Sequence, residues 1–217
     1  MTREQDSITD QAAAALDMVY SASTPEEVAR AYAAWAASYD SETAALGYSL
    51  PFQIAAWVAR HVPMGEGPLL DAGCGTGLSG PSLRALGYHD IAGLDLSEDM
   101  LRIAGSRDAY CDLRQAALGG PLPWPDGHFR AFFSTGVFTT GHAPASGLFE
   151  LVRVTRKRGH AIFTVRDQIF ESGGFPAVFA ELEQHGKWRL VEESPWFRAF
   201  AIAEPDALVK TFVFETL

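Results

Sequence analysis

The residues best placed to do chemistry are an acid and three glycines that follow a short apolar run. Asp71 comes directly after Leu69–Leu70, and glycines stand at positions 73, 75 and 77. Glycine has no Cβ, so the backbone can turn sharply and a ligand can approach it closely. A helix that begins after such a turn directs free N–H groups and a positive dipole end at that ligand. Because the Asp71 carboxylate repels pyrophosphate and suits a cationic amine, the stretch predicts a site for a ligand that carries an amine.

This stretch resembles motif I of the class I S-adenosylmethionine-dependent methyltransferases, which reads acid-x-Gly-x-Gly-x-Gly after the first strand. The resemblance implies that S-adenosylmethionine is the cofactor and that its contacts include Asp71, Gly73, Cys74, Gly75 and Gly77. Residues 75–80 also spell G-x-G-x-x-G, the fingerprint of dinucleotide-binding domains. A methyltransferase and an NAD(P)-dependent oxidoreductase are therefore both open on the glycines alone, as is a turn without a ligand.

A second acid follows the next predicted strand. Asp95 lies twenty residues after Gly75, a spacing that suits a ribose contact with either cofactor. The run LDLSEDML at residues 94–101 resembles the second methyltransferase signature. By that resemblance Asp95 holds the ribose hydroxyls, and Leu96 and Met100 flank the adenine ring. Met100 is equally at home in the core.

A third acid closes a predicted strand at Ala109–Leu113. In the family that the chain resembles, an acid here accepts a hydrogen bond from the adenine amino group, and the backbone of the next residue also contacts the ring. The resemblance assigns these roles to Asp112 and Leu113. The alternative is an acid at the protein surface where a loop begins.

An aromatic helix precedes these motifs. Thr24 is a good N-cap before Pro25, and the helix carries Tyr32, Trp35 and Tyr39 on one face. Residues 32–40 resemble a Tyr-Asp-x-Trp-Ala-x-x-Tyr-Asp segment that caps the cofactor in small-molecule methyltransferases, although Ala33 replaces the first Asp. The resemblance makes Tyr39 a cofactor contact and Tyr32 a candidate substrate contact. Packing on the core is the alternative for both rings.

One histidine stands apart from the other five. Ligands of doubly wound sheets bind at the carboxyl ends of the strands, and only His142 follows a predicted strand, at residues 131–136. His142 is therefore the candidate general base or substrate contact, with a loop histidine bonded to backbone or solvent as the alternative. The run FTTGHAP at residues 138–144 resembles the corresponding loop of the Williams–Beuren-region methyltransferase-like proteins.

Other residues near the predicted strand ends complete the set of candidates. Thr135 is assigned to the cofactor, and Phe138, Arg166 and Trp196 to the substrate. Arg166 pairs either with an acidic substrate group or with a neighbouring acid. The aromatic rings suit the surroundings of a sulfonium by cation–π attraction, but each is also plausible as packing.

Strands alternate with helices along the chain, which predicts an α/β fold with a doubly wound sheet. The resemblance implies a Rossmann-like, seven-stranded sheet, mostly parallel with an antiparallel last strand. We expect one domain over residues 1–217, with N-terminal cap helices at 1–62 and the core at 63–217. Arg130 replaces the usual Asp at the far end of the sheet, where it should affect pairing rather than chemistry. Further expected elements are helices at 48–61 and 77–86 and strands at 188–192 and 208–214.

The composition narrows the class of protein. The 217 residues are 47% hydrophobic and 20% charged, as in a globular domain. A net charge of −10 argues against nucleic acid as a partner. The two cysteines form neither a disulfide framework nor a metal cluster, and no residues have metal-ligand spacing. Without a signal sequence or an apolar run of membrane-spanning length, a cytoplasmic location with no membrane contact is expected.

Together these features predict an enzyme that transfers the methyl group of S-adenosylmethionine to an oxygen, nitrogen or carbon of a small molecule, giving S-adenosylhomocysteine. The oxidoreductase alternative lacks the Tyr-x-x-x-Lys pair of short-chain dehydrogenases, because none of Lys157, Lys187 and Lys210 lies four residues after a tyrosine. A non-catalytic, S-adenosylmethionine-binding accessory protein is the remaining alternative. The acceptor and the oligomeric state are left open.

Overall fold

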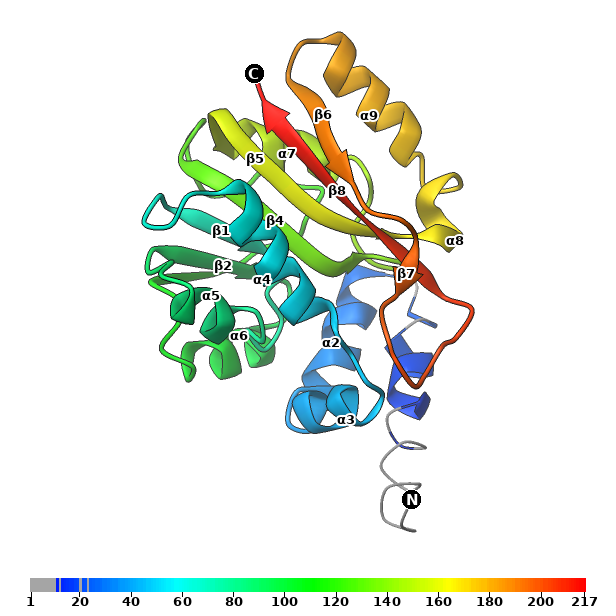
Figure 1. Cartoon of the computed structure of the whole chain (residues 1–217). Coiled ribbons are helices and arrows are strands. Elements are labelled where there is room, and N and C mark those ends of the chain that lie inside the picture. Colours follow the sequence, from blue (N-terminus) through cyan, green and yellow to red (C-terminus); the bar gives the residue numbers. More distant parts are fainter. Residues whose placement is uncertain (1–10, 12, 20, 23) are drawn as a thin grey trace.

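The computed structural model describes residues 11, 13–19, 21, 22 and 24–217; the first ten residues of the predicted cap lie outside the described part. One sheet has the order β3-β2-β1-β4-β5-β8-β6, with β7 also paired to β8 (Figure 1). The strands are β1 (Leu69–Ala72), β2 (Ile91–Asp95), β3 (Asp112–Gln115), β4 (Phe129–Phe138), β5 (Thr155–Arg166), β6 (Trp188–Glu193), β7 (Phe197–Arg198) and β8 (Leu208–Thr216).

Strand direction agrees with the predicted fold class. The pairs among β1 to β5 are parallel, whereas β8 is antiparallel to both β5 and β6. The Rossmann-like sheet with a reversed last strand is confirmed. The added strand is β7, which is only two residues long and was not predicted.

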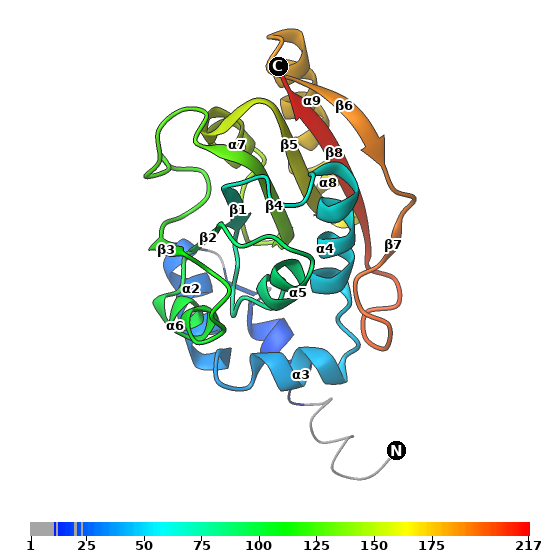
Figure 2. The same cartoon turned by 60° about the vertical axis from the view of Figure 1, so that its left-hand side comes forward.

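Helices cover both faces of the sheet. They are α2 (Pro25–Trp35), α3 (Tyr39–Ala45), α4 (Leu50–His61), α5 (Gly80–Ala85), α6 (Glu98–Gly105), α7 (Gly147–Val154), α8 (Asp167–Phe170) and α9 (Phe175–Gln184). Side chains alternate between the faces, as a strand requires: Leu69 belongs to a core cluster under α4, and Leu70 to the larger cluster under α7 and α9. Figure 2 shows α4 and α9 on opposite sides of the sheet.

The cap helices α2 and α3 lie beneath the sheet in Figure 1. They share a core cluster that joins Trp35 and Leu46 to Phe200 and to Val209 of β8. We expected one helix to carry Tyr32, Trp35 and Tyr39, and this prediction is wrong for Tyr39. Helix α2 ends at Trp35, and a turn separates it from α3, which begins at Tyr39. In this turn the Ser38 N–H donates to the Trp35 carbonyl at 3.1 Å, an i→i−3 bond that replaces the i→i−4 bond of a continuing α-helix.

Two predicted boundaries near the glycines are also wrong. The helix expected at 77–86 begins only at Gly80, because the loop runs on past Gly77. The third strand was expected at Ala109–Leu113 but begins at Asp112. Its first expected residues belong to a loop, in which Tyr110 turns inward and its hydroxyl donates to Asp71 at 2.7 Å.

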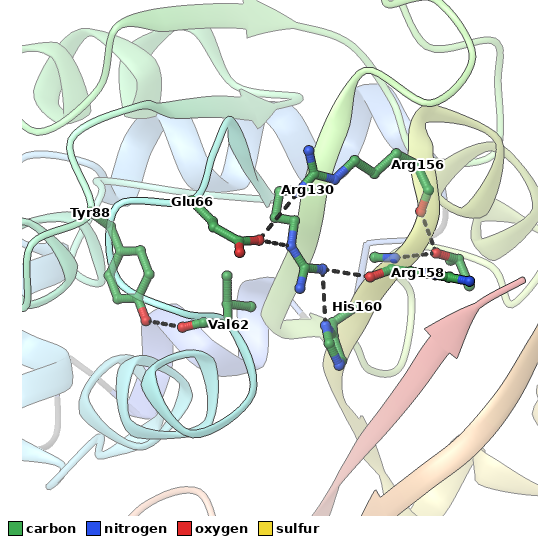
Figure 3. Close-up of polar contacts among 9 residues, drawn as sticks. Val62, Glu66, Tyr88, Arg130, Arg156, Arg158 and His160 are labelled. Carbon is green, nitrogen blue, oxygen red and sulfur yellow. Dashed lines mark hydrogen bonds and ion pairs between the residues drawn. The ribbon is translucent and has the colours of Figure 1, made fainter.

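The amino ends of the strands carry a polar cluster, shown in Figure 3. The buried Arg130 guanidinium bonds the Glu66 carboxylate, the Arg158 carbonyl at 2.8 Å and His160 Nδ1 at 3.2 Å. Arg156 adds a second contact to Glu66 at 3.2 Å. Burial, followed by the Arg130 charge, lowers the pKa of His160 to about 4. Arg130 therefore joins a polar network at the amino ends of the strands, and its effect on strand pairing stays a prediction.

Among the described residues, no helix combines the length and the apolar character needed to cross a membrane.

Candidate active site

A cavity of about 400 Å³ opens at the carboxyl ends of β1, β2 and β4, and residues of α2 and α3 form its other wall. This volume lies within the range of small-molecule sites. The structure brings most of the predicted site residues to its lining: Tyr32, Tyr39, Asp71, Gly73, Cys74, Gly75, Asp95, Leu96, Met100, Thr135 and His142.

The glycine loop forms one end of the cavity. Gly73 has φ +82°, and a Cβ there would lie 2.3 Å from Val137 Cγ2, so only glycine fits. Gly75 has φ +54° and nothing within 4 Å of where a Cβ would stand, so its bare backbone faces open space. The Gly73 and Cys74 N–H groups both donate to the Leu94 carbonyl, at 2.7 and 2.9 Å, which ties the loop to β2.

Two acids stand on either side of this loop. Both carboxylate oxygens of Asp95 accept backbone N–H groups, from Gly75 at 2.8 Å and from Ser97 at 2.9 Å, so its position is tightly defined. Asp71 is buried and accepts the Tyr110 hydroxyl. Burial, followed by the Asp95 charge, raises the pKa of Asp71 to about 7. A cation that enters the cavity is therefore favoured, because it offsets two neighbouring negative charges.

Three predicted cofactor contacts do not line the cavity. Because β3 begins at Asp112, that carboxylate lies at the wrong end of the strand, bonded to Arg114 and to Trp124. Leu113 packs in the small cluster beside Leu101. Gly77 is a packing position, since a Cβ there would meet the Tyr110 ring at 2.8 Å. Residues 116–118 line the cavity instead, and they carry no polar side chain that would have drawn attention in the sequence.

A tyrosine–histidine pair also lines the cavity. The His142 Nδ1 lies 2.8 Å from the Thr140 carbonyl, which can only accept, so Nδ1 carries the proton. Nε2 is then the basic nitrogen, and the Tyr32 hydroxyl donates to it at 2.9 Å. Burial lowers the pKa of His142, the Thr140 carbonyl raises it in part, and the Arg166 charge lowers it further. The neutral ring is the form present near neutral pH.

A polar clasp joins the cap to the glycine loop. The Thr76 hydroxyl donates to Asp40 Oδ1 at 2.6 Å, and the Arg107 guanidinium pairs with Asp40 Oδ2. Arg107 Nε also donates to the Thr76 carbonyl at 2.5 Å. The clasp holds the neighbouring Tyr39 over the cavity. Sequence reasoning missed it, although Asp40 ends the aromatic segment that pointed to Tyr39; nothing singled out Arg107.

The other predicted substrate contacts lie outside this cavity. Phe138 and Arg166 line a second, smaller cavity of about 50 Å³ that shares Tyr32, Tyr39 and Tyr48 with the first. Arg166 pairs with Glu204 at 2.8 Å rather than with an acid near it in sequence. Trp196 lines neither cavity; its ring lies against Phe170 and under the Lys210 ammonium group.

These features fit a cofactor with a cationic amine, a ribose and an adenine ring. The acids at Asp71 and Asp95 suit the amine and the ribose hydroxyls, and the bare glycine backbone permits close approach. The apolar side chains of Leu96, Met100 and Leu118 suit an adenine ring. Among the described residues, no group of three or more histidine, cysteine or acidic side chains could hold a metal ion.

The reversed last strand and the acid–glycine loop define the class I, S-adenosylmethionine-dependent methyltransferases. Residues 70–163 match the family model described as "Methyltransferase domain". The chain therefore carries a methyltransferase domain of this class, and S-adenosylmethionine is its cofactor. The family match favours this cofactor over the dinucleotide that the G-x-G-x-x-G spelling left open.

The chain is similar to human methyltransferase-like protein 27, with 34% identity over 166 residues that cover 72% of this chain and 66% of that protein. It is also similar to the yeast (Saccharomyces cerevisiae) 18S rRNA (guanine(1575)-N(7))-methyltransferase, with 42% identity over 66 residues, 30% of this chain and 24% of that protein. The structure superposes on a TehB-like S-adenosylmethionine-dependent methyltransferase from Corynebacterium glutamicum with a TM-score of 0.61 and 20% identity, covering 87% of this chain and all of that one. The chain thus spans slightly less than two thirds of the human relative and a quarter of the yeast one.

Proposed function

We propose that the protein methylates a small-molecule acceptor at oxygen, nitrogen or carbon, with His142 as general base where the acceptor must lose a proton. The observation that carries this proposal is that one cavity is lined both by the acids and glycines of the loop after β1 and β2 and by the Tyr32–His142 pair. When bound, S-adenosylmethionine supplies a methyl group on a positively charged sulfur, so transfer needs no other co-reactant.

The residues then have separate tasks. Asp71 and Asp95 hold the cationic amine and the ribose, while the Tyr39 ring, the Met100 side chain and residues 116–118 enclose the cofactor. The acceptor takes the place of the Tyr32 hydroxyl at His142 Nε2, which receives the acceptor's proton, and the Thr140 carbonyl keeps the ring in the tautomer that can do so. Exclusion of water and alignment of the reacting atoms supply most of the catalysis, because the methyl donor is already activated.

A small acceptor is favoured over RNA by the cap helices that form one wall of the cavity and by charge. The cap helices narrow the space beside His142 to a pocket, and the chain has a net charge of −10. The yeast rRNA methyltransferase is similar only over 66 residues. The proposal includes a cytoplasmic location, because the sequence shows no signal sequence and no apolar run of membrane-spanning length.

The first test measures the melting temperature during titration with S-adenosylhomocysteine. Saturation at about 100 times the dissociation constant should stabilise the protein by about 2.7 kcal/mol. Asp95→Ala should abolish this shift, while Glu66→Ala, at the far edge of the sheet, should leave it intact. No shift in the unsubstituted protein would overturn the cofactor assignment.

The second test follows the methyl group. Protein and labelled S-adenosylmethionine are incubated with an ultrafiltered metabolite extract or with purified total RNA, and the Asp95→Ala variant serves as the inactive control. Label in a small-molecule product that the control does not form supports the proposal. Label confined to RNA would replace the small acceptor with a nucleic acid, and no transfer despite cofactor binding would favour an accessory role.

A further inference from the structure

The second cavity, next to the proposed reaction centre, has no part in the proton transfer described above. It shares Tyr32, Tyr39, Tyr48 and Gly136 with the main cavity, so the two spaces meet where an acceptor would lie. Its volume of about 50 Å³ exceeds the ~10–15 Å³ that one water needs. A group of a few atoms on the acceptor therefore fits into it.

A buried hydroxyl in this second cavity points to a polar ligand. Thr139 is 9% exposed, and its Oγ1 has no hydrogen-bond partner among the described residues. Buried polar atoms nearly always have a hydrogen-bond partner, and a buried polar atom without one destabilises the folded protein. A hydrogen-bond acceptor brought by a ligand would satisfy it.

The same cavity contains a buried cation. Arg166 is 8% exposed and pairs with Glu204 at 2.8 Å. A guanidinium carries five N–H donors, so it can hold Glu204 and a second carboxylate at once. Its charge also reaches the other end of the acceptor space, because it contributes to lowering the pKa of His142.

We propose that the second cavity anchors the carboxylate of an acidic small-molecule acceptor, between the Thr139 hydroxyl and the Arg166 guanidinium. The rings of Tyr32, Tyr39 and Tyr48, which line both cavities, suit a flat, apolar body. The reacting group of the same molecule then lies beside His142 in the main cavity. This inference rests on the proposed function, since it names the class of acceptor for that site.

The test is calorimetric binding of benzoate and benzamide to the full chain saturated with S-adenosylhomocysteine. The two probes have the same ring and nearly the same shape, and they differ in charge. We expect benzoate to bind at least tenfold more tightly. The double variant Arg166→Gln/Glu204→Gln removes both charges together and should make the two probes bind alike.

The variant Thr139→Val distinguishes an effect on benzoate affinity from an effect on the stability of the fold. It should weaken benzoate binding about fivefold, the effect of one hydrogen bond, while the melting temperature stays the same or rises because an unpaired hydroxyl is removed. Thr211→Val is the matched control: its hydroxyl is also buried and has no hydrogen-bond partner in the described part of the chain, but it lines neither cavity.

Equal affinity for benzoate and benzamide, or equal effects of the two threonine variants on benzoate, would overturn the inference while cofactor binding leaves the proposed function intact. Failure to bind S-adenosylhomocysteine would overturn both.

Discussion

Ionisable side chains gather at both edges of the sheet, formed by the amino ends and the carboxyl ends of the strands, but their hydrogen-bond partners differ. At the amino edge, Arg130 is surrounded by groups that it satisfies, namely Glu66, the Arg158 carbonyl and His160 (Figure 3). At the carboxyl edge, Asp71 and Asp95 lie side by side next to a cavity, and their partners are neutral hydrogen-bond donors.

This difference separates stabilisation from ligand binding. Opposite charges that pair within the protein stabilise the fold and offer nothing to a ligand. Buried carboxylates without a cationic partner have raised pKa values, and they weaken the fold until a cation arrives. Burial, followed by the Asp95 charge, raises the pKa of Asp71 to about 7, and Asp71 lines the cavity that would receive the cation.

The largest effect is expected from loss of the proposed base, which should lower turnover and leave cofactor binding unchanged. His142→Gln should lower turnover about 10²- to 10⁴-fold, the usual contribution of a general base, without weakening binding of S-adenosylhomocysteine. Initial rates and calorimetric titration measure the two quantities. Tyr32→Phe is the companion variant: it keeps the imidazole and should cost much less. An unchanged rate in His142→Gln would mean that the acceptor needs no base.

Removal of the Arg130 guanidinium at the amino edge should destabilise the fold without changing cofactor affinity. Arg130→Met leaves His160 and the Arg158 carbonyl without their buried donor and should lower the free energy of unfolding by about 2–3 kcal/mol. Urea denaturation measures this, and cofactor affinity at low temperature should not change. Arg156→Met, the exposed partner of the same Glu66, should cost under about 0.5 kcal/mol. Similar losses in both variants would contradict the account of a buried network.

His160 at the amino edge and Asp71 at the carboxyl edge should change the free energy of unfolding with pH in opposite directions. His160 has its pKa lowered from 6.5 to about 4, so the unfolded chain binds its proton first, and this group makes stability rise with pH across that window. Asp71 has its pKa raised from 3.8 to about 7, so its contribution is present at low pH and is lost as pH rises to 7.

Single variants should reveal each slope. Relative to the unsubstituted protein, Asp71→Asn should make the free energy of unfolding rise more steeply between pH 4 and 6.5, and His160→Gln should make it rise less steeply. We expect ~1–2 kcal/mol for each across the window, discounted for the partial exposure of His160. Changes of the same sign in the two variants would contradict the comparison.

The smallest effect concerns the clasp between cap and loop. Asp40→Asn keeps an oxygen for Thr76 but loses the charge that pairs with Arg107, and it should weaken S-adenosylhomocysteine binding about fivefold, or ~1 kcal/mol. The matched control is Asp126→Asn, which removes the ion pair between Arg153 and an exposed carboxylate in the connection before β4, at the amino ends of the strands, and should change nothing. Equal affinities for both variants would show that the clasp does not position the cap.

The sequence by itself determined the cradle and the layout of the sheet. Gly73 and Gly75 require positive φ, Asp71 and Asp95 come at the ends of apolar strands, and alternating strands and helices predict a doubly wound, mostly parallel sheet. These are local properties, because residue type restricts backbone conformation and strand burial within a few positions. His142 was found the same way, from the rule that ligands lie at the carboxyl ends of strands.

Only the tertiary structure decided which distant side chains meet. Asp40 reaches Arg107 across 67 positions and Tyr32 reaches His142 across 110, while Arg166 selects Glu204 over the acids near it in sequence. A three-residue shift of β3 moved Asp112 away from the cavity and left residues 116–118 to line it. Such pairings depend on strand register and on the path of loops, which packing of the whole chain sets and no local pattern encodes.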